Sequence, residues 1–366
     1  MHISTTQFQP SLLASFLAWV WVRLTRVNEQ KYRDNGWNSY AEKLQFRLLK
    51  LRLRFFSRNH AGQLQQMADD MRSCRISSRV FNLYREKSES CLSRPPTSEV
   101  TFKHSGNAGD IIYALPTIKA LSTGRPARLF LKLDVPVSGW TEKEHPLGKA
   151  GLTAPMVEFL RPLLEHQVWL SSIQIHNGEA VDYDLDMFRK VPNIKGDRGD
   201  IAHWYFWMFA ESADLSQAWL EVRPPPVPSR KIVLARSPRY HNQCINYAFL
   251  RDLGEIDFVG TPSEFEEMKQ TLPNLRHLEC EDFLQLARVI KAARFFIGNQ
   301  SFPYAVAEAL KVPRILEVCP EIPNVIPTGG NTGEAFFQPN FEKLVRHFWE
   351  QTTQPSRTAE SIAVNL

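Results

Sequence analysis

The sequence of 366 residues lacks the motifs that mark several common protein classes. Its five cysteines are scattered, without a CxxC pair or a His/Cys cluster at metal-ligand spacing. Neither a disulfide scaffold nor a zinc module is therefore expected, and a reducing compartment is favoured. There is also no GxxxxGKS/T phosphate loop, no GxSxG nucleophile motif and no HExxH zinc motif. The sequence predicts a protein without metal or resident cofactor.

Long apolar runs are also missing. The most apolar stretch, Leu12–Val22, is about 11 residues long, whereas a membrane-spanning helix needs roughly 20. No basic region precedes this stretch, so we expect no secretory signal and a cytoplasmic location. The basic, leucine-rich segment Leu44–Phe56 leaves two interpretations of residues 1–95: a peripheral anchor on the inner face of a membrane, or helices packed on the main body.

Charge is unevenly distributed. Residues 1–100 hold 16 of the 44 Lys and Arg residues but 8 of the 39 Asp and Glu residues, so the net charge of +5 belongs to the N-terminal extension. The remainder of the chain is slightly acidic. We therefore expect no nucleic-acid partner.

Proline-rich segments divide the chain into zones. Ser93–Ser98 predicts one linker, and Arg223–Arg230, with four prolines in eight residues, predicts a second. We expect a basic helical extension over 1–95, an α/β lobe over 99–222, the linker 223–230, a second α/β lobe over 231–345 and a tail over 346–366.

Short apolar strands alternate with helical patterns in both lobes, which predicts right-handed βαβ units and parallel sheets. The fold class is therefore α/β, with two Rossmann-like lobes and a cleft between them. The expected strands are Val100–His104, Arg128–Val135, Val168–Ile175, Lys231–Ala235, Ile256–Val259, Leu275–Leu278, Phe295–Ile297 and Arg314–Val318. The expected helices are Asp110–Leu121, Met156–Glu165, His203–Ala210, Tyr247–Leu253, Ser263–Thr271, Phe283–Ala292 and Pro303–Leu310.

Ligands of parallel sheets bind beyond the carboxyl ends of the strands, so the loops at these ends are the candidate sites. After the first strand, Gly106, Asn107 and Gly109 form a turn that lets a ligand approach the backbone. Asp110 follows, either as a catalytic carboxylate or as a residue that caps the helix. Alternating aspartates at Asp182–Asp186 suggest a metal-binding pair or, as we prefer, a solvated strand edge.

The second lobe offers two further loops. Arg236, Ser237 and Arg239 follow its first strand, and guanidinium groups match the oxygens of a diphosphate; a solvated surface turn is the alternative. Small polar residues later lead into a helix whose N-terminus would attract an anion. These residues are Asn299, Gln300 and Ser301. Glu308, two turns into that helix, would bind a ribose or face solvent.

Two stretches resemble the lipopolysaccharide heptosyltransferases, glycosyltransferase family nine, which have the GT-B fold. His104–Leu121 (HSGNAGDIIYALPTIKAL) is similar to the opening strand, glycine turn and helix of that family. Asp282–Val318 (DFLQLARVIKAARFFIGNQSFPYAVAEALKVPRILEV) is similar to the block around its D-S/T-G loop. The resemblance covers Val100 to Val345. At the D-S/T-G loop the chain has Gln300, Ser301 and Phe302, and the family's following histidine is Ala305.

The resemblance implies an inverting, metal-independent glycosyltransferase of the hexosyl or heptosyl type, acting on cell-envelope polysaccharide. A nucleotide-diphosphate sugar would be the co-substrate, and a glycan or lipid-linked hydroxyl the acceptor. Asp110 would be the general base, and Arg236, Ser237, Arg239 and the loop around Ser301 would bind the donor. Two alternatives stay open: a nucleotide-sugar epimerase, and a non-catalytic binding protein with the same fold.

Overall fold

The computed structural model describes residues 58–136, 151–191, 194–223 and 231–353. The segments Leu12–Val22 and Leu44–Phe56, on which the membrane interpretation depends, lie outside the described residues, as does almost all of the second linker. The chain divides into two compact units, residues 1–79 and 80–366. Both α/β regions therefore belong to one unit. Within the described ranges, no helix is both long enough and apolar enough to cross a membrane.

The N-terminal α/β region forms a four-stranded parallel sheet in the order β3-β2-β1-β4. Its strands are β1 (Val100–His104), β2 (Ala127–Leu131), β3 (Leu170–Ile175) and β4 (Tyr183–Asp184). The accompanying helices are α4 (Arg58–Leu92), α5 (Ala108–Ser122), α6 (Ala154–Glu165), the 3-10 helix η2 (Leu185–Lys190) and α7 (Ile201–Phe209). Strand β1 has the predicted bounds, whereas the two-residue β4 is too short to leave a periodic signal.

The C-terminal α/β region forms a six-stranded parallel sheet in the order β10-β9-β8-β5-β6-β7, which is the Rossmann order. Its strands are β5 (Ile232–Ala235), β6 (Ile256–Phe258), β7 (Leu275–His277), β8 (Phe295–Asn299), β9 (Arg314–Glu317) and β10 (Thr332–Ala335). Its helices are η3 (Pro238–Tyr240), η4 (Ala248–Leu253), α8 (Pro262–Thr271), α9 (Phe283–Ala292), α10 (Phe302–Leu310) and α11 (Gln338–Thr353). The two parallel sheets confirm the predicted α/β fold class.

Several local predictions differ from the structure. The helix predicted over Tyr247–Leu253 is the 3-10 helix η4, the strand predicted over Arg128–Val135 is β2 with shifted bounds, and strands β4 and β10 were not predicted. Strand β10 (Thr332–Ala335, sequence TGEA) has little apolar character, so its extended conformation depends on pairing with the neighbouring strand β9.

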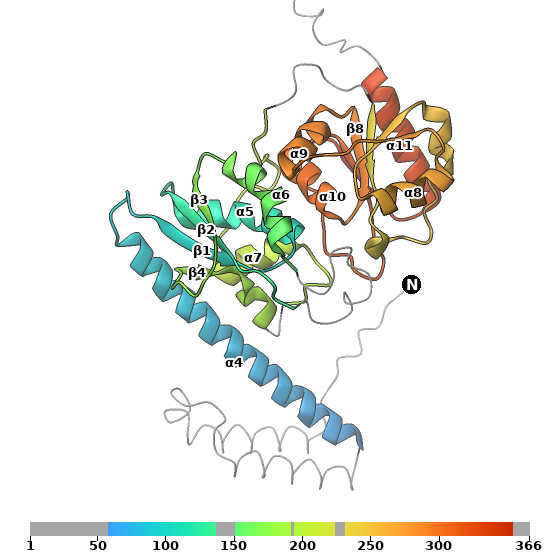
Figure 1. Ribbon diagram of the computed structural model, residues 1–366. Coiled ribbons are helices and arrows are strands. Elements are labelled where there is room, and N and C mark those ends of the chain that lie inside the picture. The colour runs from blue at the N-terminus through green and yellow to red at the C-terminus, as the bar shows by residue number, and fades with distance from the viewer. Residues whose placement is uncertain (1–57, 137–150, 192–193, 224–230, 354–366) are drawn as a thin grey trace, which may run out of the picture. The chain divides into compact units, whose positions relative to one another are not determined.

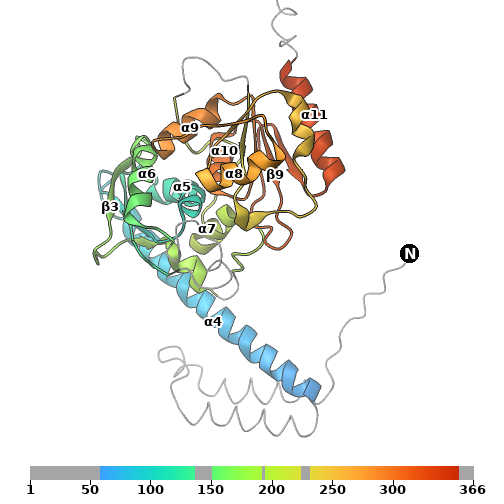
Figure 2. The same ribbon diagram turned by 45° about the vertical axis from the view of Figure 1, so that its right-hand side comes forward.

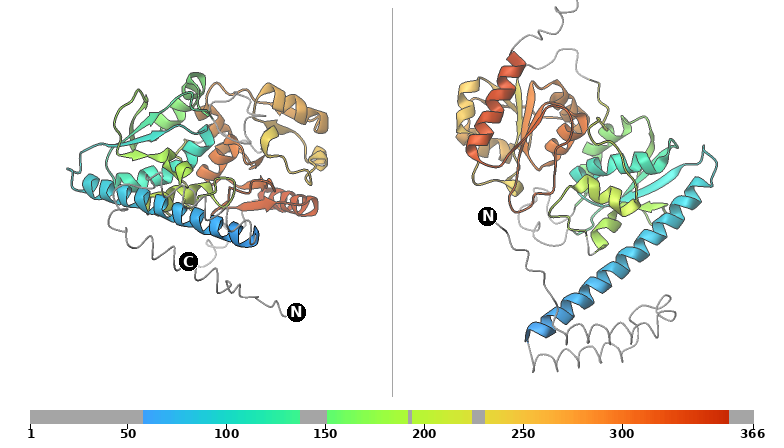
Figure 3. Two further views of the ribbon diagram at one scale, coloured as in Figure 1. Left: turned by 90° about the horizontal axis from the view of Figure 1, so that it is seen from below. Right: turned by 180° about the vertical axis from the view of Figure 1, so that it is seen from behind.

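Helix α10 is the element on which the two regions meet. It contacts α5, while α9 contacts α6, and one continuous hydrophobic core runs from the N-terminal sheet to this face of the C-terminal sheet. A second core lies on the other face, under α8 and α11. Figures 1 and 2 show α9 and α10 on the side facing α5 and α6, and Figure 3 shows α11 on the opposite face. Every residue of α10 from Tyr304 to Leu310 is buried, as its almost entirely apolar sequence requires.

Candidate functional site

The predicted site loops lie at the topological switch points of the two sheets. In the N-terminal sheet β1 is the first strand and β4 its neighbour on the far side, and in the C-terminal sheet β5 and β8 have the same relation. The loops leaving these two pairs of strands diverge to opposite faces, which opens a crevice for ligands in open α/β sheets. The loops after β1 and β5 therefore have the positions that the sequence predicted.

Asp110 lies in the first turn of α5, where Asn107 is the N-cap residue. Its carboxylate forms an ion pair with Nη2 of Arg189, which comes from η2, the segment after β4. Gly106 makes this contact sterically feasible. A Cβ at Gly106 would lie 2.7 Å from Oδ2 of Asp110 and 2.8 Å from Cε1 of His104, both closer than van der Waals contact.

His104, at the end of β1, is fully buried beneath the Gly106 turn. The N–H of Gly106 donates to its Nδ1 at 2.9 Å, so the ring proton resides on Nε2, which donates to the hydroxyl of Tyr205 at 2.7 Å. Burial lowers the pKa of His104 to about 4. The imidazole is therefore neutral near pH 7 and fixes the backbone of the turn rather than exchanging protons.

The loop after β5 is tied to the loop after β8. Asn299 accepts a hydrogen bond from the N–H of Ser237 at 3.0 Å and donates one to the carbonyl of Ser237 at 2.6 Å. This double link sets the start of η3, which carries Arg239. The guanidinium of Arg239 stacks on the ring of Tyr240 at 4.9 Å, yet its buried Nε and Nη1 have no hydrogen-bond partner in the part of the chain that the structure describes.

Two unpartnered, buried guanidinium donors are unusual, because each desolvated donor without a partner costs about 1–3 kcal/mol. The helix α10 begins directly after the β8 loop to which Ser237 is bound. Ser301 is the N-cap residue of α10, but its side chain makes no capping hydrogen bond, so the first N–H groups of the helix are not capped by it. The positive charge of Arg239 and the N-terminus of α10 together favour an anion.

The structure brings Asp110 toward this C-terminal loop. A Cβ at Gly109 would lie 3.8 Å from the Cα of Phe302, so the first turn of α5 touches the first turn of α10. Tyr240 provides a second link: its burial raises its pKa, Arg239 opposes that rise and Asp110 adds to it. Asp110 therefore belongs to a turn that touches the start of α10, and it acts on the same tyrosine as Arg239.

Four side chains that were predicted to bind the donor are held by neighbours within the chain. Arg236 forms a bidentate ion pair with Glu317, at 2.8 Å for both contacts, and stacks on Tyr247. Asn299 is fully buried and uses its amide on Ser237. These contacts give Arg236 and Asn299 a role in shaping the loop, and donor binding by the two residues stays a prediction.

Gln300 has the same outcome. Its Nε2 donates to the carbonyl of Ile322 at 2.6 Å and to Oδ1 of Asn324 at 2.7 Å, and its Oε1 accepts from the N–H of Cys319 at 2.7 Å. A carboxylate at this position could not donate to those two oxygens. The departure from the family pattern at Gln300 therefore fits the loop that follows β9.

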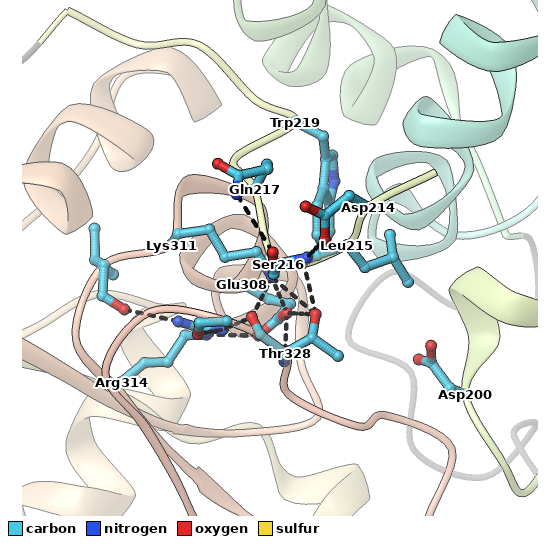
Figure 4. Close-up of polar contacts among 12 residues, drawn as sticks. Asp200, Asp214, Leu215, Ser216, Gln217, Trp219, Glu308, Lys311, Arg314 and Thr328 are labelled. Atoms are coloured by element: carbon cyan, nitrogen blue, oxygen red, sulfur yellow. Dashed lines mark hydrogen bonds and ion pairs between the residues drawn. The ribbon is translucent and has the colours of Figure 1, made fainter. Parts of the chain in front are cut away.

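Glu308 is also held by neighbours within the chain. Figure 4 shows its carboxylate among Lys311, Arg314 and Thr328, at the far end of α10 from the candidate site. Nε of Arg314 lies 2.5 Å from Glu308, and Arg314 is itself fully buried. Burial lowers the pKa of Lys311 to about 8 even though Glu308 opposes that shift. Glu308 is 2% exposed and fixes this polar cluster.

The prediction that Asp182–Asp186 is a solvated edge is wrong in one respect. The segment does form edge strand β4, but Asp186 is buried and accepts hydrogen bonds from the N–H of Ser105 and from Arg189. Arg189 was not predicted as a site residue, because its partner Asp110 lies 79 residues away and no local sequence pattern indicates the contact. Within the ranges the structure describes, no group of three His, Cys, Asp or Glu side chains is placed to share a metal ion.

Comparison with known proteins returns no matching family model and no matching curated sequence. Solved structures similar to the chain include a glycosyl transferase family 9 protein of Veillonella parvula, at 10% identity and TM-score 0.44, covering 68% of this chain and 88% of that one. The E. coli ADP-heptose lipopolysaccharide heptosyltransferase II is 12% identical, with TM-score 0.46 and coverage of 70% and 100%. The E. coli heptosyltransferase WaaC with ADP is 12% identical, with TM-score 0.41 and coverage of 70% and 98%. All three are glycosyltransferases of the kind that the sequence motifs resemble.

Proposed function

We propose that the protein is a glycosyltransferase that moves a sugar from a nucleotide-diphosphate donor to a hydroxyl acceptor. The observation that carries this proposal is the guanidinium of Arg239, whose buried Nε and Nη1 lack partners among the described residues. Its loop is tied through Ser237 and Asn299 to the loop that leads into α10, whose N-cap side chain makes no capping hydrogen bond. A diphosphate would supply acceptor oxygens for these donors and negative charge for the helix end.

Asp110 supplies the chemistry in this proposal. As general base, its carboxylate would take the proton of the acceptor hydroxyl while that oxygen attacks the anomeric carbon from the face opposite the diphosphate. The bond from the anomeric carbon to the diphosphate then breaks, and its electron pair leaves with the nucleoside diphosphate. The reaction is thus inverting, and the charge on the leaving group is met by Arg239 and the helix end without a metal.

A direct test measures binding of nucleotide diphosphates and nucleotide sugars to the full chain by calorimetry. ADP is the first probe, because the heptosyltransferase WaaC has been solved with ADP. Charge-assisted hydrogen bonds contribute about 1.5–3 kcal/mol, so Arg239→Ala should weaken binding roughly 10- to 150-fold. Arg346→Ala, at an exposed position on α11, is the matched control and should bind like the wild type. Equal affinity of Arg239→Ala and the wild type would reject this site.

One observation favours a second candidate, a non-catalytic binding protein. Gln300 replaces the acidic residue of the family pattern, and its amide is fully used within the chain. Such a protein would bind nucleotide diphosphates through Arg239 but would release no free nucleoside diphosphate from any of the nucleotide sugars tested. Measuring both binding and turnover on the same samples separates the two functions.

A further inference from the structure

Among the residues that the structure describes, only Arg189 forms a hydrogen bond or ion pair with the side chain of Asp110. It uses Nη2 for Asp110 and Nη1 for Oδ1 of Asp186, at 3.0 Å. The planar, rigid fork of a guanidinium makes it suited to bridging two carboxylates in one fixed geometry. One carboxylate, Asp186, is buried and anchored, while the other is the proposed base.

The anchor is built firmly into the fold. Asp186 accepts the N–H of Ser105 at 3.0 Å, its own N–H donates to Asp184, and Lys103 lies 3.6 Å from its second oxygen. The guanidinium of Arg189 also lies over the ring of Phe188, at 4.6 Å from the ring centroid to Cζ. The segments after β1 and β4 therefore fix Asp186, and Asp186 and Phe188 in turn hold the guanidinium of Arg189.

The contact between Arg189 and Asp110 involves one carboxylate oxygen, Oδ2. The space around that oxygen is closed on the side of Gly106, where even a methyl group would collide with it. The other oxygen, Oδ1, makes no hydrogen bond or ion pair within the described part of the chain. An aspartate side chain otherwise turns broadly about its terminal torsion, so a tether on one oxygen defines where the other one points.

We propose that Arg189 is a positioning residue that holds Asp110 by Oδ2 and directs Oδ1 to the acceptor hydroxyl. This inference rests on the proposed function. In the transfer, the hydroxyl proton moves to Oδ1, and Arg189 keeps its own protons and its charge throughout. Arg189 touches no substrate; its contribution is the fixed orientation of the base, and misplacement of a reacting group by about 1 Å can cost on the order of 100-fold in rate.

The first test requires no substrate. The folded full-length chain is treated with a water-soluble carbodiimide and an amine, and coupling at Asp110 is followed by peptide mass spectrometry. Loss of the tether in Arg189→Met should speed coupling at Asp110 several-fold, and Arg189→Lys should give an intermediate rate. Lys190→Met removes a neighbouring, more exposed cation that pairs with Asp184 at 3.7 Å, and should couple like the wild type. Equal rates in the wild type, Arg189→Met and Arg189→Lys would overturn the inference.

The second test separates orientation from a general structural effect. With a nucleotide sugar that the wild type turns over, Arg189→Ala should lower kcat roughly 10- to 100-fold and leave the donor KM within about twofold. Added guanidinium chloride at millimolar concentration should restore part of kcat in Arg189→Ala but not in Asp110→Asn. Loss of donor binding together with kcat, or the absence of rescue, would contradict a positioning role. If the wild type turns over no donor, the proposed function fails, while the coupling rates still decide whether Arg189 holds Asp110.

Discussion

The loops after β1 and β5 occupy equivalent switch points in their sheets, yet they differ in how their charges are satisfied. After β1, Asp110 is paired with Arg189, which is paired with Asp186. After β5, Arg239 has two buried donors without a partner among the described residues. The charged groups of the first loop are paired with one another, whereas these two donors are not paired.

This difference separates two kinds of functional residue. A side chain that reacts must be held in one orientation before the substrate arrives, and the network after β1 provides that. A side chain that binds must keep free hydrogen-bonding groups, and a folded protein tolerates the resulting cost of about 1–3 kcal/mol per desolvated donor. In the proposal, the paired carboxylate of Asp110 carries the chemical step, and the unpaired donors of Arg239 bind the ligand.

The largest effect should come from breaking the β1 side of this comparison. Asp110→Asn removes the proton acceptor and keeps the shape, so turnover of a nucleotide sugar should fall by about 10²- to 10⁴-fold. Donor affinity, measured by calorimetry, should be unchanged because Asp110 makes no contact with the diphosphate in the proposal. Asp197→Asn, at a surface ion pair with Arg198, is the control. Wild-type turnover in Asp110→Asn would remove this residue from the mechanism.

A smaller effect is expected from acid. Burial lowers the pKa of His104 to about 4 in the folded protein, whereas in the unfolded chain the imidazole has its ordinary pKa of 6.5. Above pH 6.5 both states are neutral and the full stability is present. As the pH falls from 6.5 to 4 the unfolded chain takes up the proton first, so stability is lost, by about 3 kcal/mol in all.

Urea unfolding at pH 7 and at pH 4.5 measures this loss. His104→Gln keeps hydrogen-bonding groups but cannot titrate, so its stability should fall less between the two pH values than that of the wild type. An identical loss in both proteins would show that His104 is not the group responsible.

A still smaller effect on stability should follow from changing the loop after β8. Gln300→Glu removes the donors to Ile322 and Asn324, which should lower the free energy of unfolding by about 1–3 kcal/mol. Gln217→Glu, on an exposed side chain, should change it by less than about 0.5 kcal/mol. Stability of Gln300→Glu equal to the wild type would mean that the amide is not needed for this loop.

The smallest effect sharpens the comparison most, because its sign is unusual. Arg239→Met should raise the stability of the ligand-free protein by about 1 kcal/mol, since it removes buried donors that have no partner. Arg189→Met should instead lower stability, because Asp186 loses a partner. Thermal unfolding of both variants without ligand gives the two signs. Destabilisation by Arg239→Met would indicate that its donors are satisfied in solution.

Much of the fold could be predicted from the sequence because its elements carry local signals. Strand β1 and helix α9 have the predicted bounds, since each is an apolar segment flanked by polar turn or capping residues. Strand β10 could not be predicted, because its four residues include Gly333 and Glu334 and obtain their conformation from pairing with β9. Periodicity indicates how a segment buries itself, and it is silent where a neighbour imposes the structure.

The candidate site divides in the same way. The loops after β1, β5 and β8 were predicted, because glycines, arginines and small polar residues stand where strands end. The use of each side chain could not be predicted. Arg236 pairs with Glu317, 81 residues away, and Glu308 on α10 pairs with Arg314 on the following strand β9, a contact that no helical or strand period marks. Arg189 escaped notice for the same reason.

Helix α10, buried in the hydrophobic core that the two α/β regions share, has a consequence for dissection of the chain. Severing the backbone within residues 223–230 would give two fragments whose largest apolar faces, on α5 with α6 and on α9 with α10, had covered each other. Neither half should remain dispersed alone, but co-expressed halves should recombine into a nicked protein, because the mutual burial that joins them needs no peptide bond.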